Sequence, residues 1–172
     1  PSKLRHFSRI SGSMDGTSAS PCSSAMTYIP VPPVMMGSLP AAHAEWECRN
    51  NRLAWMGLNA DGFVAAAQAA RAKYGAARVA LVLGTSTSSI GASEEAYAQL
   101  TPEGLYPPAL RRPIVHTPHS LGDYVQHALA LEGPCMTVAT ACSSSAKVFA
   151  QAERLIRAGL ADAAVVGGVD SL

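Results

Sequence analysis

The sequence is poor in charged and aromatic residues. Only 15% of its 172 residues are charged and 6% are aromatic, against 48% that are hydrophobic, and the formal net charge is +1. So balanced a charge gives no electrostatic basis for binding nucleic acid, and we expect no nucleic-acid partner. No apolar run approaches the ~20 residues that a helix needs to cross a membrane, so we expect no membrane partner either.

Cysteine is also sparse, and its spacing excludes two kinds of site. The four cysteines are Cys22, Cys48, Cys135 and Cys142, with no Cys-x-x-Cys pair among them. This pattern fits neither a disulfide framework nor a zinc site, and we expect no bound metal. Mostly free thiols are typical of a reducing compartment, so we expect a cytoplasmic protein.

Residues 1–27 differ in composition from the rest of the chain. They are rich in serine, carry three Lys or Arg and a single acid, and lack the apolar core of a secretory signal. We interpret them as a disordered tail or a non-native extension, and residues 28–172 as one incomplete domain. The chain begins at Pro1 rather than Met and stops just after an apparent strand, so we expect a longer protein around it.

Short apolar runs alternate with segments of helical spacing. The runs predict buried strands at 78–84, 135–140 and 163–167. Helices are predicted at 49–58, 61–74, 92–100, from Ser120 to Gly133, and 143–158, with Asp61 as one N-cap and a capping box formed by Ser120 and Asp123. Strands that alternate with helices predict an α/β domain with a mixed, mainly parallel sheet and helices on its faces.

Cys142 lies between one of these strands and the helix that follows it. At a helix N-terminus the dipole and the unpaired N–H groups stabilise a thiolate, and the same N–H groups can hold an oxyanion. The residues alone leave open a buried structural cysteine. The other cysteines lack this context, and we interpret them as structural or incidental.

Residues 140–146, Thr-Ala-Cys-Ser-Ser-Ser-Ala, resemble the nucleophile motif of the β-ketoacyl-acyl-carrier-protein synthases of the thiolase-like superfamily. Residues 83–88, 131–134 and 156–170 resemble the family's upstream Gly/Ser loop, the turn into the nucleophile strand and the following strand. The resemblance runs from about residue 45 to 172 and implies an N-terminal half, one half of a layered αβαβα fold. Ala139 and Ala146 stand where polyketide modules usually carry Asp and Leu, which favours a stand-alone bacterial type.

The resemblance implies a mechanism centred on Cys142. Its thiol would accept an acyl group from acyl carrier protein, and decarboxylation of a malonyl group on a second carrier would lengthen the chain to 3-oxoacyl-acyl carrier protein in fatty-acid or polyene-type lipid synthesis. The Cys142 N–H would contribute to the oxyanion hole, Thr87 and Ser88 would line the acyl pocket, and Met136 would face that pocket or a dimer seam. A solvated loop and a core methionine remain open for these three residues. No cofactor is expected, since phosphopantetheine carries the substrates.

The resemblance also limits what this chain can do. The histidines and lysine that drive decarboxylation belong to the family's C-terminal half, and none of the five histidines here matches them: His6, His43, His116, His119 and His127. We therefore expect a homodimeric whole protein, and a fragment that is at most acylated and is poorly soluble or oligomeric. Two alternatives stay open: a coenzyme A-dependent thiolase-like cysteine acyltransferase, and a non-catalytic partner subunit like the chain-length factors, which usually lack the nucleophile.

Overall fold

The computed structural model describes residues 2–11, 28–31 and 37–171. The strands are β1 (Ser2–Ser11), β2 (Tyr28–Val31), β3 (Val79–Gly84), β4 (Cys135–Val138) and β5 (Ala163–Asp170). The α-helices are α1 (Arg49–Leu58), α2 (Phe63–Tyr74), α3 (Ile90–Tyr97), α4 (Ser120–Leu129) and α5 (Ser144–Arg157). Short 3₁₀ helices are η2 (Ala41–Trp46), η3 (Ala76–Arg78), η4 (Pro108–Leu110) and η5 (Ala141–Ser143).

The strands form one mixed sheet in the order β2-β1-β5-β3-β4. The three strands predicted from apolar runs make its parallel part, since β3 pairs in parallel with both β4 and β5. β1 runs antiparallel to β5 and to β2. The predicted α/β class is confirmed, and the antiparallel pairs lie on the β1 side of the sheet.

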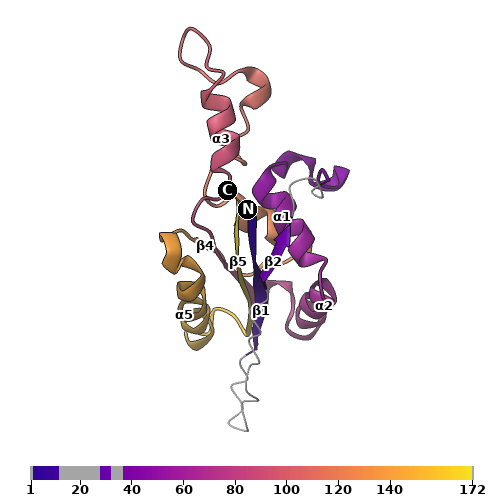
Figure 1. Ribbon diagram of the computed structural model, residues 1–172. Helices are drawn as coiled ribbons and strands as arrows, with labels where there is room; N and C mark the ends of the chain where they lie inside the picture. The colour runs from indigo at the N-terminus through magenta and orange to yellow at the C-terminus, as the bar shows by residue number, and fades with distance from the viewer. Residues whose placement is uncertain (1, 12–27, 32–36, 172) are drawn as a thin grey trace.

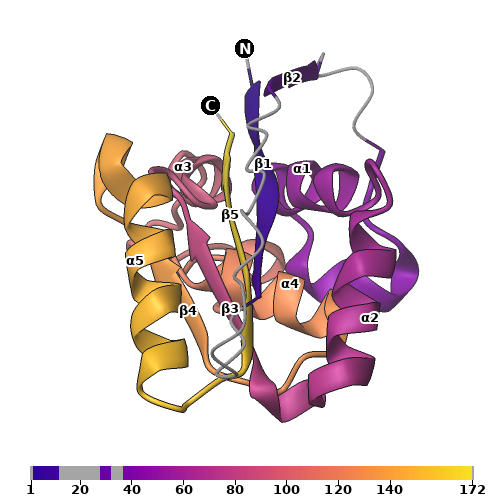
Figure 2. The same cartoon turned by 90° about the horizontal axis from the view of Figure 1, so that it is seen from below.

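Helices cover both faces of this sheet. Figure 2 shows α5 on one face and α1, α2 and α4 on the other. Every residue of β3 is buried, and alternate residues of β3 belong to two different apolar clusters. Leu81 and Leu83 pack with the α1–α2–α4 side, whereas Ala80 and Val82 pack with α5. A strand buried on both faces in this way reads as a continuous apolar run, which is why its sequence predicts it so clearly.

β1 falls within the segment that we expected to be a disordered tail or an extension. The structure instead describes Ser2–Ser11 as a strand that pairs along most of β5, with Lys3 opposite Asp170 and Ser11 opposite Ala163. The physical reason is that β5 would otherwise leave a row of unpaired backbone groups at the edge of the sheet. Residues 12–27 lie outside the described residues, so the boundary at residue 27 stays a prediction.

Two glycines bring the start of α5 into contact with the sheet. A Cβ on Gly84, the last residue of β3, would lie 2.9 Å from the carbonyl carbon of Ser144. A Cβ on Gly168 in β5 would lie 2.7 Å from the hydroxyl oxygen of Ser145. The first turn of α5 therefore packs directly against the backbone of Gly84 and Gly168. This contact fixes the position of the connection between β4 and α5.

Two of the predicted helix caps are absent. The residue before α2 is Gly62 with φ 70°, not Asp61, and Gly62 makes no side-chain cap. Ser120 is the first residue of α4 rather than its cap, and its hydroxyl accepts a hydrogen bond from Asn51 Nδ2 at 3.2 Å. The Ser120 hydroxyl, which the predicted capping box would have used, therefore forms a contact between α1 and α4 instead.

α3 and the segment after it project from the body of the molecule (Figure 1). Tyr97 is 64% exposed there, and its ring meets Tyr106 edge-on with centroids 5.3 Å apart. His116 ties the end of the projection together, with Nδ1 3.0 Å from Ser93 Oγ and Nε2 2.8 Å from the Leu110 carbonyl oxygen. Residues 102–118 hold five prolines and, apart from η4, form no helix or strand, as prolines favour. Among the described residues, no helix is long and apolar enough to span a bilayer.

Candidate active site

Cys142 lies in the sharp connection between β4 and α5. β4 ends at Val138, the 3₁₀ turn η5 holds Cys142 at its centre, and α5 begins two residues later at Ser144. The side chain of Cys142 is exposed. The sequence predicted this cysteine at the N-terminus of the helix. The structure inserts a 3₁₀ turn there, because the Thr140 N–H donates to Ser144 Oγ at 2.8 Å and draws the chain into a tighter bend.

The residue before the cysteine has an unusual backbone. Ala141 has φ 51°, in the left-handed region that non-glycine residues seldom occupy. Its carbonyl oxygen accepts hydrogen bonds from Ser144 Oγ at 2.7 Å and from Ser86 Oγ at 3.1 Å. Such a conformation costs of the order of 1 kcal/mol and persists where surrounding bonds hold it. These two hydroxyls are the bonds that hold it here.

Asp170 organises the loop that follows β3. Its Oδ1 accepts from the Ser86 N–H at 2.5 Å, from Thr85 Oγ1 at 3.1 Å and from the Thr87 N–H at 3.3 Å. Its Oδ2 lies 3.3 Å from Ser86 Oγ. Since β3 and β5 are parallel neighbours, their carboxyl ends meet at one edge of the sheet, and this carboxylate therefore lies against the loop that contacts Ala141.

Two of the predicted substrate-binding residues are linked to Asp170 through their backbone, Thr87 directly and Ser88 through the Thr85 hydroxyl. Thr87 is half-buried and lines a pocket of about 340 Å³ together with Asn50, Ser89 and Ile90. Its hydroxyl also lies 3.3 Å from the Ser171 carbonyl oxygen. The Thr87 N–H thus bonds Asp170 directly. Asp170 in turn bonds Ser86, and Ser86 bonds Ala141 in the turn that carries the cysteine.

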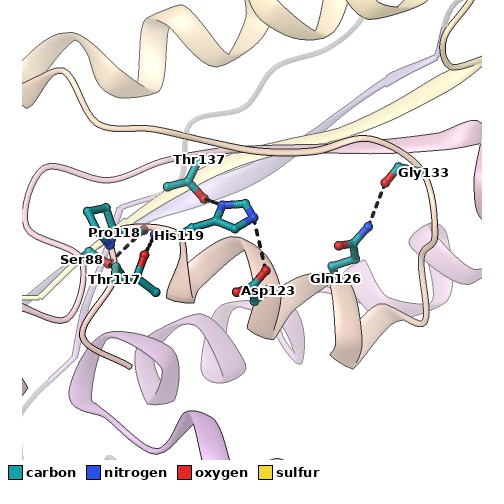
Figure 3. A network of polar contacts seen from close by, with 8 residues as sticks. All are labelled: Ser88, Thr117, Pro118, His119, Asp123, Gln126, Gly133 and Thr137. Carbon is teal, nitrogen blue, oxygen red and sulfur yellow. Dashed lines mark hydrogen bonds and ion pairs between the residues drawn. The ribbon is translucent and has the colours of Figure 1, made fainter. Parts of the chain in front are cut away.

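Ser88 and Met136 have other surroundings. Ser88 is buried with φ 48°, and its hydroxyl donates to the Pro118 carbonyl oxygen at 3.2 Å (Figure 3). Met136 lies on β4, is 36% exposed, and its sulfur accepts a hydrogen bond from Gln151 Nε2 of α5 at 3.4 Å. Neither side chain takes part in the Asp170–Ser86–Ala141 network.

The other described thiols differ sharply from Cys142. Burial, together with a smaller effect of the nearby Asp123 carboxylate, raises the pKa of the Cys135 thiol to about 12. Burial also raises the pKa of Cys48, which is 7% exposed. Neither thiol has the exposed position that Cys142 has. Cys22 lies outside the described residues.

Histidines contribute to the packing around β4. His119 Nδ1 lies 2.9 Å from Thr137 Oγ1, and Nε2 lies 3.2 Å from Asp123 Oδ1, so one ring connects α4 to β4 (Figure 3). Within the part of the chain that the structure describes, no histidine is hydrogen-bonded to Cys142. A cysteine hydrolase would need such a base. The described part of the chain contains no group of three or more His, Cys, Asp or Glu side chains placed to hold a metal.

Sequence reasoning missed Ser86 and Asp170. In the sequence, each is only part of a longer stretch of resemblance, residues 156–170 for Asp170 and residues 83–88 for Ser86. A signal was available: two parallel strands, β3 and β5, each end in polar residues. Groups at the carboxyl ends of neighbouring parallel strands lie at the same edge of the sheet.

Comparison with known proteins bears on the same site. A family model described as the N-terminal domain of beta-ketoacyl synthase matches residues 50–172. A cyclo-acetoacetyl-L-tryptophan synthase from Aspergillus oryzae is 45% identical over 56 residues, which are 33% of this chain and 1% of that protein.

Among solved structures, a chain in the complex of the ketosynthase ApeO with its chain length factor ApeC, from Xenorhabdus doucetiae, matches with a TM-score of 0.63 at 27% identity. The match covers 95% of the present chain and 39% of that chain. The present chain therefore spans well under half the length of this structural relative.

Proposed function

The chain belongs to the β-ketoacyl synthase family, whose N-terminal domain it contains, and we propose that the Cys142 thiol accepts the acyl group that a condensing enzyme extends. The observation that carries this proposal is the position of the thiol. Cys142 is exposed on a turn whose backbone is held by two hydroxyls, whereas Cys48 is buried, Cys135 is half-buried, and both have raised pKa values. An accessible thiol on a fixed turn is what nucleophilic acyl transfer requires.

Acyl loading is a thioester exchange. The Cys142 thiolate attacks the carbonyl carbon of an acyl thioester, a carbon–sulfur bond forms, and the carbonyl electrons move to oxygen. Collapse of this intermediate breaks the bond to the departing thiolate, which takes up a proton from solvent. The Cys142 N–H would donate to the transient oxyanion, whose stabilisation is a major part of acyl-transfer catalysis.

Condensation follows on the loaded thiol. A malonyl thioester on acyl carrier protein loses carbon dioxide, and the resulting enolate carbon attacks the acyl-Cys142 carbonyl. The Cys142 thiolate leaves, and 3-oxoacyl-acyl carrier protein is released. We place this reaction in fatty-acid or polyene-type lipid synthesis by a stand-alone synthase. The chain described here has the attachment point, so we propose that it is acylated without completing condensation.

We propose that Thr87 and Ser88 shape the acyl pocket in different ways. Thr87 is supported by its place in the lining of the 340 Å³ pocket. Ser88 would act indirectly, by fixing the shape of the loop that carries Thr87. Its hydroxyl is bonded to the carbonyl of Pro118, and its left-handed backbone bends the loop. No resident cofactor is part of the proposal, because both substrates arrive as thioesters.

The partner is proposed to dock on β4. Within the described residues β4 is the last strand of the sheet, and it pairs with β3 alone. The carbonyls of Pro134 and Val138 accept from β3, so by alternation the backbone groups of Cys135 and Thr137 face the open edge. Met136 adds an exposed apolar side chain there. We propose that the whole protein dimerises through this edge, with a second copy or with a subunit like a chain length factor.

Loading can be tested by intact-protein mass spectrometry. The chain is incubated with S-hexanoyl-N-acetylcysteamine, a small thioester with the same thiol terminus as phosphopantetheine. A single hexanoyl adduct is expected, mapped to Cys142 by peptide analysis, abolished in Cys142→Ala and retained in Cys135→Ala. An adduct that persists in Cys142→Ala, or no adduct at all, would refute the assignment.

A further inference from the structure

We propose that Asp170 is a positioning residue that acts through Ser86 and the Ala141 carbonyl to aim the Cys142 N–H at the oxyanion. The inference rests on the proposed function and adds to it a control element outside the nucleophile motif. Asp170 is separated from Ser86 by 84 positions in the chain, and from the cysteine by the whole of α5.

The first step is the hold that Asp170 has on Ser86. One carboxylate oxygen accepts the Ser86 N–H at 2.5 Å and the Thr87 N–H at 3.3 Å, and also the Thr85 hydroxyl at 3.1 Å. Hydrogen bonds to an ionised acceptor are about twice as strong as neutral ones. The backbone of Ser86 is therefore fixed by a charge that sits at the end of β5.

The second step is the contact between Ser86 and the turn. The Ser86 hydroxyl donates to the Ala141 carbonyl oxygen at 3.1 Å, and the Ser144 hydroxyl donates to the same oxygen at 2.7 Å. Ser144 belongs to α5, whereas Ser86 belongs to the loop that Asp170 holds. The Ala141 carbonyl is thus bonded both to α5 and to the loop after β3.

The third step is covalent. A trans peptide is planar, so its C=O and the N–H of the next residue point in opposite directions in one plane. Fixing the Ala141 carbonyl therefore fixes the direction of the Cys142 N–H. The left-handed φ of 51° at Ala141 makes this constraint necessary, because the residue has a lower-energy backbone conformation available if the anchors are released.

The test compares two reactions of the same thiol. Iodoacetamide alkylates Cys142 by displacement at a saturated carbon and forms no oxyanion, whereas S-hexanoyl-N-acetylcysteamine must pass through one. Ser86→Ala and Asp170→Asn are expected to slow acylation about tenfold, part of the ~100-fold or more lost when an oxyanion donor is removed outright. Their alkylation rates are expected to stay within about twofold of the parent chain, since displacement needs no oxyanion donor.

Two further variants serve as controls. Ser86→Thr keeps the hydroxyl and should keep the acylation rate. Ser93→Ala removes a hydroxyl of α3 that bonds His116 Nδ1 and lies outside the turn, so both of its rates should be unchanged. Thermal melts of all variants check that each one is folded.

Each outcome is decisive. Acylation of Ser86→Ala at the parent rate overturns the inference, and so does an equal fall in both reactions, which would mean that the turn is only a structural support. A parent chain that is alkylated but never acylated overturns the proposed function itself and takes this inference with it.

Discussion

Gly84 of β3 and Ser144 of α5 are in backbone contact: a Cβ on Gly84 would lie 2.9 Å from the Ser144 carbonyl carbon and 3.1 Å from its carbonyl oxygen. Ser144 is also the residue whose hydroxyl bonds Thr140, Ala141 and Thr85. The contact therefore sets the distance between the sheet and the turn that carries Cys142. Several measurements can test this arrangement and its surroundings.

Gly84→Ala should destabilise the chain and disturb the site. The added methyl group would collide with the backbone of Ser144, and overpacking of this kind typically costs about 1–3 kcal/mol of unfolding free energy. Urea unfolding measures that loss, and acylation of Cys142 should slow with it. Gly91→Ala is the matched control, because its Cβ would meet nothing within 4 Å and it lies inside α3. Equal midpoints for the two variants would contradict the close contact.

The thiols should differ in reactivity. A pKa of about 12 at Cys135 gives a thiolate fraction roughly a thousandfold below that of an ordinary thiol at neutral pH. In a Cys22→Ser background, iodoacetamide should therefore modify Cys142 first, and Cys48 and Cys135 only slowly, as followed by peptide mass spectrometry. Urea should bring the three rates together. Fast native alkylation of Cys135 would show that the enclosed environment is wrong.

The ion pair between Arg78 and Asp162 should make stability depend on pH in the acid range. Arg78 Nη2 lies 2.6 Å from Asp162 Oδ1 and Nε lies 2.9 Å from Oδ2, and these hydrogen bonds lower the pKa of the Asp162 carboxyl. A depressed folded-state pKa contributes stability that is present above the unfolded pKa and is lost as pH falls through the folded value. In Asp162→Asn, the melting temperature should fall less as the pH is lowered than it does in the parent chain. Glu153→Gln, which removes an exposed helix pair with Arg157, should change it less.

The open edge of β4 should govern association. Met136→Lys places a charge on the exposed apolar side chain of that strand, and it should shift the chain toward monomer in sedimentation velocity, because inward or edge charges oppose strand pairing. Leu160→Lys makes the same change at a side chain that is 55% exposed beyond α5. It should leave the association state unchanged. A monodisperse monomer in the parent chain would argue against docking at β4.

Local sequence signals predicted the centre of the fold well. The run from Val79 to Gly84 is apolar on both faces because both faces are buried, so its pattern needs no tertiary information. α1 matches its predicted bounds, and α2 ends before Gly75, whose φ of 88° suits glycine. The position of Cys142 between a strand and a helix was likewise readable, since both elements carry strong patterns.

What the sequence could not predict depends on contacts between distant segments. β1 has a serine-rich sequence of weak strand preference, and it is ordered by the backbone edge of β5. Ser120 lost its predicted cap to Asn51, 69 positions away in the chain. Asp170 looked like a strand-end charge, because nothing near it in sequence shows that Ser86 lies beside it. Cys142 was expected directly at the N-terminus of the helix, and the structure instead holds it in a 3₁₀ turn two residues before α5.

The link from Asp170 to Ala141 has a consequence for synthesis on the ribosome. Translation delivers the cysteine to the exit tunnel before it delivers the aspartate, with α5 between them. Until β5 is made, the Ala141 carbonyl lacks the support that Ser86 receives from Asp170. We expect the turn that carries Cys142 to reach its final geometry only after β5 has paired with β3.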